Sequence, residues 1–115
     1  MLRGEVRMVD LEPVRGAEAN KRRPAVIVSN DAANSTAARL GRGVLTIVPV
    51  TSSVDRVYPF QVLIPGETAG LQRDSKAQAE QVRSIDAERI GEPLGRLPDQ
   101  LMTSLDDALR LHLAL

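Results

Sequence analysis

The sequence predicts a small, mainly β domain, barrel-like or α+β, that ends in one amphipathic helix. Short apolar segments bounded by Gly, Pro and polar residues recur along most of the chain. They do not alternate with long helical patterns, which argues against a βαβ fold. Leucine then recurs every four residues near the C-terminus. At 115 residues the chain has the length of one domain, and we treat residues 1–115 as a single unit.

The first two strands are predicted on either side of a polar loop. Residues 4–11 alternate loosely, with Val6 and Met8 on one face, which is typical of a half-buried strand. Residues 24–29 form a continuous apolar run of the kind found in strands that are buried on both faces.

The loop between these strands, residues 16–24, carries Glu18 and three consecutive cations, Lys21, Arg22 and Arg23, and Pro24 closes it. An Arg that precedes a Pro is biased toward extended backbone, so Arg23 should lie at the mouth of the second strand. A guanidinium fixed there suits a planar anion such as phosphate. The residues alone leave open the alternative of an ordinary solvated loop.

The middle of the chain continues with a short helix and two more strands. Asp31 is the expected N-cap of a helical segment over residues 32–40. Residues 44–51 form a β-branched third strand, in which Pro49 suggests a sheet edge or a bulge. Residues 58–64 are the fourth strand.

The last third of the chain is predicted as strand material followed by a helix. Residues 75–85 alternate in places and favour a strand, although their Ala, Glu and Gln content also suits a helix. Short segments at Ile90 and 94–97 can complete a barrel. A helix beginning at Pro98-Asp99 then carries the apolar stripe Leu101, Leu105, Leu109 and Leu113, with Ala108 and His112 beside it.

Composition excludes several classes of function. The chain has no cysteine and a single histidine, His112, so neither a thiolate zinc site nor a Ser-His-Asp triad is expected, and we predict no metal and no cofactor. Fifteen basic and fifteen acidic residues cancel, which argues against a general polyanion binder but allows a local basic patch. With one Tyr and one Phe, base-stacking platforms are scarce. No signal core or membrane span is visible, so we expect a cytoplasmic protein with no membrane partner.

Taken in order along the chain, several short strings resemble the MazF/PemK family of toxin endoribonucleases, particularly its mycobacterial type. No single string decides the matter, but their order and spacing are specific, and they run nearly from end to end. The strings are Arg3-Gly4-Glu5-Val6, Val9-Asp10-Leu11-Glu12-Pro13, Gly16-Ala17-Glu18, Arg23-Pro24-Ala25-Val26, Val48-Pro49-Val50-Thr51-Ser52, Tyr58-Pro59-Phe60, Gly70-Leu71, Asp74-Ser75 and Ala79-Glu80-Gln81-Val82-Arg83-Ser84-Ile85-Asp86.

This resemblance implies an SH3-like β-barrel of about five to seven strands with a C-terminal helix, acting as a homodimer. It further implies metal-independent, sequence-specific cleavage of single-stranded RNA, such as messenger, transfer or ribosomal RNA. The products would carry 2′,3′-cyclic phosphate and 5′-hydroxyl ends. A growth-inhibiting toxin of this kind would be neutralised by a cognate MazE-like antitoxin.

The resemblance also assigns site residues. Arg23 and Thr51 take the positions of the two main catalytic residues, and either Glu18 or Glu80 is the candidate base. RNA contacts are expected from Ser52, Ser53, Gln81, Lys21, Arg22 and Gln78. Some family members carry an Arg where this chain has Gln78, so a second catalytic Arg is missing at that position.

Two alternatives remain open from the sequence. A gyrase-poisoning toxin shares the barrel and acts by binding a protein, and an inactive barrel would serve only as an interaction module. Neither has a reason to keep Arg23-Pro24 and Pro49-Val50-Thr51 at a shared phosphate-sized site.

Overall fold

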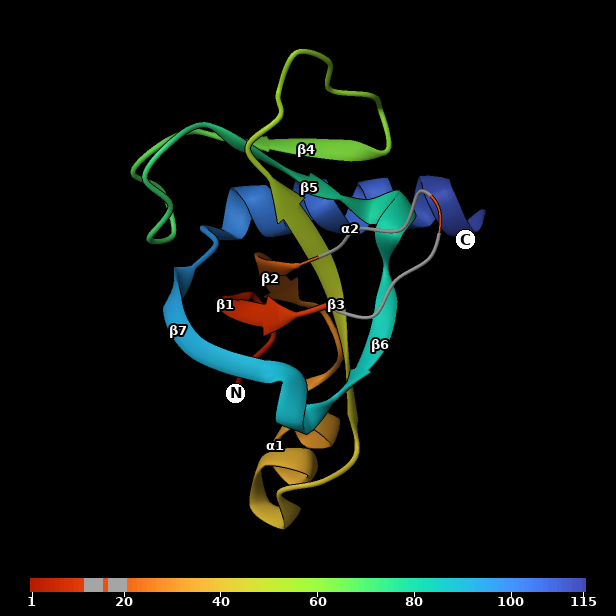
Figure 1. Ribbon diagram of the computed structural model, residues 1–115. Coiled ribbons are helices and arrows are strands. Elements are labelled where there is room, and N and C mark those ends of the chain that lie inside the picture. Colours follow the sequence, from red (N-terminus) through yellow and green to blue (C-terminus); the bar gives the residue numbers. More distant parts are fainter. Residues whose placement is uncertain (12–15, 17–20) are drawn as a thin grey trace.

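The structure, a computed structural model, describes residues 1–11, 16 and 21–115 (Figure 1). Seven strands dominate it, with two α-helices and two short 3₁₀ turns. In chain order the elements are β1 (Glu5–Asp10), β2 (Arg22–Ile27), α1 (Asp31–Leu40), β3 (Val44–Thr51), β4 (Gln61–Ile64), β5 (Ser75–Gln78), η1 (Ala79–Gln81), β6 (Arg83–Asp86), η2 (Ala87–Arg89), β7 (Ile90–Arg96) and α2 (Asp99–Leu113).

The strands form one curled antiparallel sheet in the order β4-β5-β3-β2-β1-β7, and β6 pairs with β3 away from this path. In Figure 1 the sheet wraps into an incomplete barrel, with α2 across one end and α1 at the opposite pole. The predicted mainly β fold with a C-terminal helix is therefore confirmed. Within the described ranges, neither helix is long and apolar enough to cross a membrane.

The central strand is β3, so of the two expectations for Pro49, a sheet edge or a bulge, the sheet edge is wrong. On one side β3 pairs with β2, where Ala25 lies opposite Pro49. On its other side β3 pairs with β6 up to Ile47 and with β5 from Val50 onward. Pro49 thus falls where β3 changes partners, so the missing N–H interrupts no ladder on that side.

Several predicted boundaries shift. β2 begins at Arg22, which places Arg23 inside the strand. The region 58–64 is a strand only over Gln61–Ile64, because Tyr58 to Phe60 form a turn closed by Gln61 N–H donating to the Tyr58 carbonyl at 2.8 Å. The segment 75–85 is divided into β5, η1 and the beginning of β6. Asn30, not Asp31, caps α1, because its side chain accepts the Ala33 N–H at 2.8 Å.

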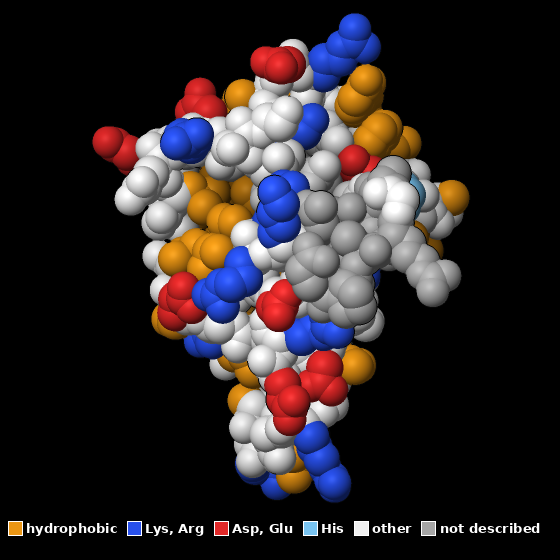
Figure 2. Space-filling view, viewed as in Figure 1, with side chains coloured by type: hydrophobic (Ala, Val, Ile, Leu, Met, Phe, Trp, Pro, Cys, Tyr) orange, Lys and Arg blue, Asp and Glu red, His pale blue; other side chains and the backbone are white. Residues whose placement is uncertain are grey.

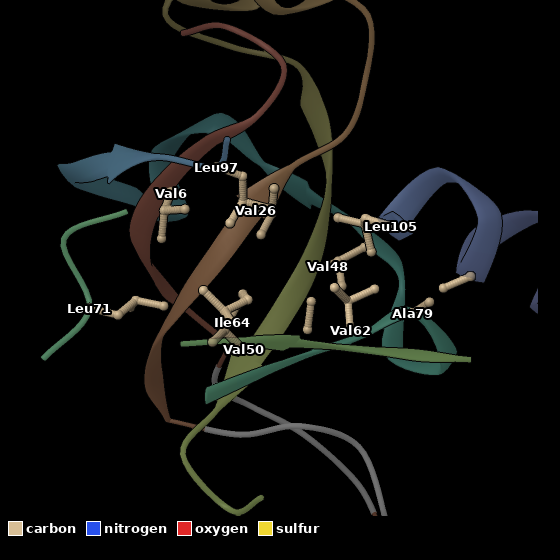
Figure 3. Close-up of a cluster of buried hydrophobic side chains, with 12 residues drawn as sticks. Val6, Val26, Val48, Val50, Val62, Ile64, Leu71, Ala79, Leu97 and Leu105 are labelled. Carbon is tan, nitrogen blue, oxygen red and sulfur yellow. The ribbon is translucent and has the colours of Figure 1, made fainter. Parts of the chain in front are cut away.

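Two apolar clusters lie on opposite faces of the curled sheet. The first fills the barrel between the sheet and α2, and contains Val26, Val48, Val50 and Leu105 (Figure 3). The second contains Ala25, Ile27, Leu45 and Ile47, with Ala37 of α1 packed against it. In β3, Leu45 and Ile47 belong to the second cluster and Val48 and Val50 to the first, as expected of a strand that is covered on both faces.

The predicted leucine stripe on α2 is only partly buried. Leu105 is fully buried and Ala108 nearly so, whereas Leu113 is 49% exposed. The helix therefore packs through its middle turns, and its C-terminal end, including His112, lies on the surface.

Glu5 illustrates how the N-terminal strand is held. Its carboxylate accepts the Leu2 N–H, and Arg7 Nε lies 3.2 Å from its Oε1. Burial pushes the pKa of Glu5 upward, but the Leu2 N–H, the Arg7 guanidinium and the amino terminus together lower it below the ordinary 4.5. A lowered pKa in the folded state stabilises the fold above the pKa of the unfolded chain. That contribution disappears as the pH falls through the folded value.

We therefore expect Glu5→Gln to lower the free energy of unfolding near pH 7 by up to about 1 kcal/mol. The difference from the native chain should shrink as the pH is lowered toward about 3. Urea denaturation of both proteins across this range measures it. A difference that stays constant with pH would show that the charge of Glu5 is not what stabilises this corner.

Candidate active site

Strand pairing brings Arg23 and Thr51 to the same end of the sheet. Ala25 lies opposite Pro49 in the β2–β3 register, and Arg23 and Thr51 each lie two residues farther toward that end. Because side chains alternate along a strand, both project on the same face as Ala25 and Pro49. Both side chains are half-buried. A guanidinium and a hydroxyl from neighbouring strands are thus held on rigid backbone rather than on loops.

Beyond these residues the strands separate and border a cleft of about 470 Å³. Figure 2 shows it as a hollow with an apolar floor beside Lys and Arg side chains. The two strand ends supply one wall, and the loop after β4 together with β7 supplies the other. Its described lining residues are Lys21, Arg22, Arg23, Pro24, Val50, Thr51, Ser52, Gly70, Leu71, Gln72, Arg73, Ser75 and Leu94.

The cleft concentrates positive charge in a chain whose net charge is zero. Four of its described lining residues are cations, and none is an acid. Three of the cations, Lys21 to Arg23, belong to the run identified in the sequence, and Arg73 is the fourth. A concave, cationic surface of this kind attracts anions such as phosphates.

Arg73 was not predicted from the sequence. It reaches the cleft because the loop carrying it lies tightly against β7. A Cβ placed on Gly70 would be 2.0 Å from the Leu94 carbonyl oxygen, and Gly70 has a left-handed φ of +78°. Gly70-Leu71 was visible as a motif, but the loop's docking against β7 depends on a tertiary contact that sequence periodicity does not reveal.

Arg22 is engaged at the rim of the cleft. Its Nη2 lies 3.0 Å from Glu92 Oε2 and 3.1 Å from Oε1, and both side chains are more than half exposed. A hydrogen bond from its own backbone N–H, followed by the Arg22 guanidinium, lowers the pKa of Glu92. Glu92 on β7 therefore holds Arg22 in place at the entrance, where an incoming anion can compete for it.

Thr51 begins a polar turn. Its Oγ1 accepts the Ser53 N–H at 3.2 Å, so the hydroxyl hydrogen can still be donated to a ligand. Ser52 lines the cleft, whereas Ser53 is exposed and lies outside the lining.

Glu80 is placed differently from Arg23 and Thr51. It lies in η1 and is not among the cleft's lining residues. Its Oε2 accepts from Gln61 Nε2 at 2.8 Å, and Gln61 Oε1 in turn accepts the Tyr58 N–H at 3.1 Å. The other carboxylate oxygen is buried and makes no hydrogen bond to the described residues. Glu80 thus closes a network beneath the turn that joins β3 and β4.

The remaining predicted residues are spread around this region. Gln78 ends β5 opposite Gln61, and Gln81 ends η1; both are half-buried and lie outside the cleft lining. Glu18 lies outside the described residues. No cluster of three or more His, Asp or Glu side chains able to hold a metal ion occurs in the described part of the chain.

Comparison with known families decides to which family the chain belongs. The family model described as "PemK-like, MazF-like toxin of type II toxin-antitoxin system" matches residues 2–113. The chain belongs to this family.

Relatives of this MazF-like chain span its whole length. It is 62% identical to the endoribonuclease MazF9 of Mycobacterium tuberculosis over 115 residues, which is 100% of this chain and 98% of that protein. Among solved structures, MazF from Deinococcus radiodurans superposes with a TM-score of 0.84 at 28% identity, covering 100% of this chain and 97% of that one. A mycobacterial endoribonuclease in complex with its cognate antitoxin superposes with a TM-score of 0.77 at 25% identity, covering 100% and 96%. The family resemblance and its mycobacterial type, inferred from the sequence, are confirmed.

Proposed function

We propose that this MazF-like chain is a sequence-specific endoribonuclease that cleaves single-stranded RNA and inhibits growth. One observation carries the proposal: Arg23 and Thr51, on adjacent strands, border a cleft with four cationic and no acidic lining residues among those described. Identity of 62% to a protein named an endoribonuclease supports the same activity. We assign the RNA backbone to the cleft.

The chemistry follows from what RNA itself provides. The 2′-hydroxyl is the nucleophile, so the protein needs no Ser or Cys for attack. Deprotonated by a base, it forms a bond to phosphorus while the bond to the 5′-oxygen breaks. The 5′-oxygen leaves with a proton. This leaves a 2′,3′-cyclic phosphate on one fragment and a 5′-hydroxyl on the other.

Arg23 and Thr51 serve the phosphate in this scheme. A guanidinium can contact two phosphate oxygens at once and stabilise the charge that develops in the transition state. Guanidinium groups in proteins stay protonated, so Arg23 acts electrostatically and does not transfer a proton. The Thr51 hydroxyl donates to a phosphate oxygen. Glu18 and Glu80 remain the candidates for the base, and Ser52, Ser53, Lys21, Arg22, Gln78 and Gln81 the candidate RNA contacts.

We further propose that the chain acts as a homodimer in the cytoplasm and is neutralised by a MazE-like antitoxin. Membership of a toxin–antitoxin family supports the second partner, as does the solved relative in complex with its cognate antitoxin. For the dimer, α2 and β4 offer exposed leucines beside one another, with Leu63 45% and Leu111 58% exposed. The relatives found give no support to a gyrase-binding toxin.

The test is incubation of the purified protein with a long single-stranded RNA in EDTA. We expect cleavage to proceed in EDTA, because the proposed charge stabilisation comes from guanidinium groups and not from a metal ion. The cuts should fall at a few short sequences. Fragments should carry 2′,3′-cyclic phosphates, and DNA of the same sequence should stay intact because it lacks the 2′-hydroxyl. RNA left intact across diverse sequences would refute the proposal. Growth arrest without RNA cleavage would instead favour a binding toxin.

A further inference from the structure

Lys76 is an unusual residue in this chain. It lies within β5 with 8% of its surface exposed, and among the described residues it is the one buried ionisable side chain. The whole sequence has two lysines against thirteen arginines. Lysine is rarely buried without a partner for its charge, because removing an ammonium from water is costly.

The strand register places Lys76 on the face of the sheet that carries Arg23 and Thr51, next to the cleft but not among its described lining residues. It lies opposite Thr51 on one side of β5 and opposite Leu63 on the other. Cross-strand neighbours project on the same face of a sheet, so Lys76 shares the face that carries Thr51 and Arg23. Lys76 is paired directly with Thr51, and Arg23 lies on the next strand, two residues beyond the last β2–β3 pair, so all three residues lie at one end of the sheet.

The charge of Lys76 is not matched by a described acid. Its Nζ donates to the Arg56 carbonyl at 2.6 Å, in the turn between β3 and β4. The four ion pairs of the described residues do not include Lys76. A carbonyl dipole offsets the cost of a buried ammonium less well than an anion does. The position therefore favours an incoming negative charge.

We propose that Lys76 is a second phosphate-binding residue, which contacts the RNA backbone next to the phosphate held by Arg23 and Thr51. The proposal rests on the proposed function and adds a contact to it. Lys76 lies two residues before Gln78 on the same face of β5.

The experiment separates the charge of Lys76 from its hydrogen bond to Arg56. Lys76→Gln keeps an N–H donor without the charge, and Lys76→Arg keeps the charge. Arg39→Gln is the matched control, since Arg39 is exposed on the last turn of α1, at the opposite pole of the molecule (Figure 1). The ligand is an RNA strand that the native protein cleaves, methylated at the attacking 2′-oxygen. Its affinity is measured against salt concentration.

Each phosphate contact to a single strand contributes about 0.7 to the slope of log affinity against log salt. We expect Lys76→Gln to reduce the slope by roughly that amount, and Lys76→Arg and Arg39→Gln to leave it unchanged. An unchanged slope for Lys76→Gln, even with weaker binding, would mean that Lys76 only holds the turn, and would overturn the inference.

Should Lys76→Gln fail to fold, the native protein provides the readout. The Lys76 ammonium gives one of two lysine side-chain signals in a ¹⁵N spectrum of the native protein. The Lys76 signal should shift when the strand binds, and a signal that does not move would overturn the inference. A native protein that neither binds nor cleaves RNA would overturn the proposed function as well. A native protein that cleaves while Lys76 shows no effect would overturn the role of Lys76 alone.

Discussion

Replacing Arg23 with Ala is expected to slow RNA cleavage by about 10²–10³-fold while leaving the fold intact. Arg23 is the second residue of β2 and is half-buried, so its guanidinium is a pre-positioned donor for the phosphate oxygens. A flexible surface cation would lose part of this effect to the entropy of ordering. Initial rates on a defined RNA, with a melting curve for each protein, measure the change.

Arg39→Ala provides the matched control, because it removes an exposed guanidinium from α1, outside the cleft lining. Its cleavage rate should stay within about threefold of the native rate, a small effect in free energy. If Arg23→Ala retained its rate to within the same margin, Arg23 would have no place in the site. The proposed assignment of the scissile phosphate to this cleft would then have to be withdrawn.

Gly70→Ala is expected to destabilise the fold by about 3 kcal/mol or more, and to lower the melting temperature by roughly 10 °C. Two costs add. The left-handed φ of +78° is unfavourable for a residue with a side chain, and the new Cβ would overlap the Leu94 carbonyl, whose oxygen would lie 2.0 Å away. The approach is mutual, since a Cβ on Gly95 would lie 2.5 Å from the Ala69 carbonyl carbon.

Gly41→Ala separates the two costs. Gly41 also has a left-handed φ, of +65°, but nothing lies within 4 Å of the Cβ position. The free energy of unfolding of Gly41→Ala should fall by only about 1 kcal/mol, which is the cost of the backbone conformation. Chemical denaturation of the three proteins gives the comparison. Equal losses for Gly41→Ala and Gly70→Ala would show that the loop can move away from β7 without penalty.

The fold class could be predicted because its signals are local. The alternation in β1, the β-branched run of β3 and the leucine spacing of α2 each reflect one periodicity along the chain. The division of 75–85 into β5, η1 and β6 could not be read in this way. The strand pattern there breaks because the segment pairs first with the end of β3 and then, after η1, with its beginning. The expectation of a sheet edge at Pro49 was wrong for the same reason.

The residues of the candidate site could be named from the sequence only in part. Arg23 and Thr51 followed from family resemblance, and the structure places them at the same end of two neighbouring strands, where both line the cleft. Arg73 and Lys76 were missed, because nothing in their neighbouring residues distinguishes them from solvated cations. Their relevance depends on the docking of a loop against β7 and on the burial of one face of β5. Glu80 is a contrasting case: its position in the sequence suggested catalysis, and in the fold its carboxylate binds Gln61, outside the cleft.

Because β3 contributes side chains to both apolar clusters, it determines how the protein unfolds. Leu45 and Ile47 belong to one apolar cluster, and Val48 and Val50 belong to the other. No segment containing β3 can open without exposing both clusters, so the two halves of the molecule share one cooperative unfolding event rather than melting separately. Thr51 ends this strand, and its position is therefore as durable as the whole fold. A protein built this way would keep the proposed phosphate-binding geometry until it denatures.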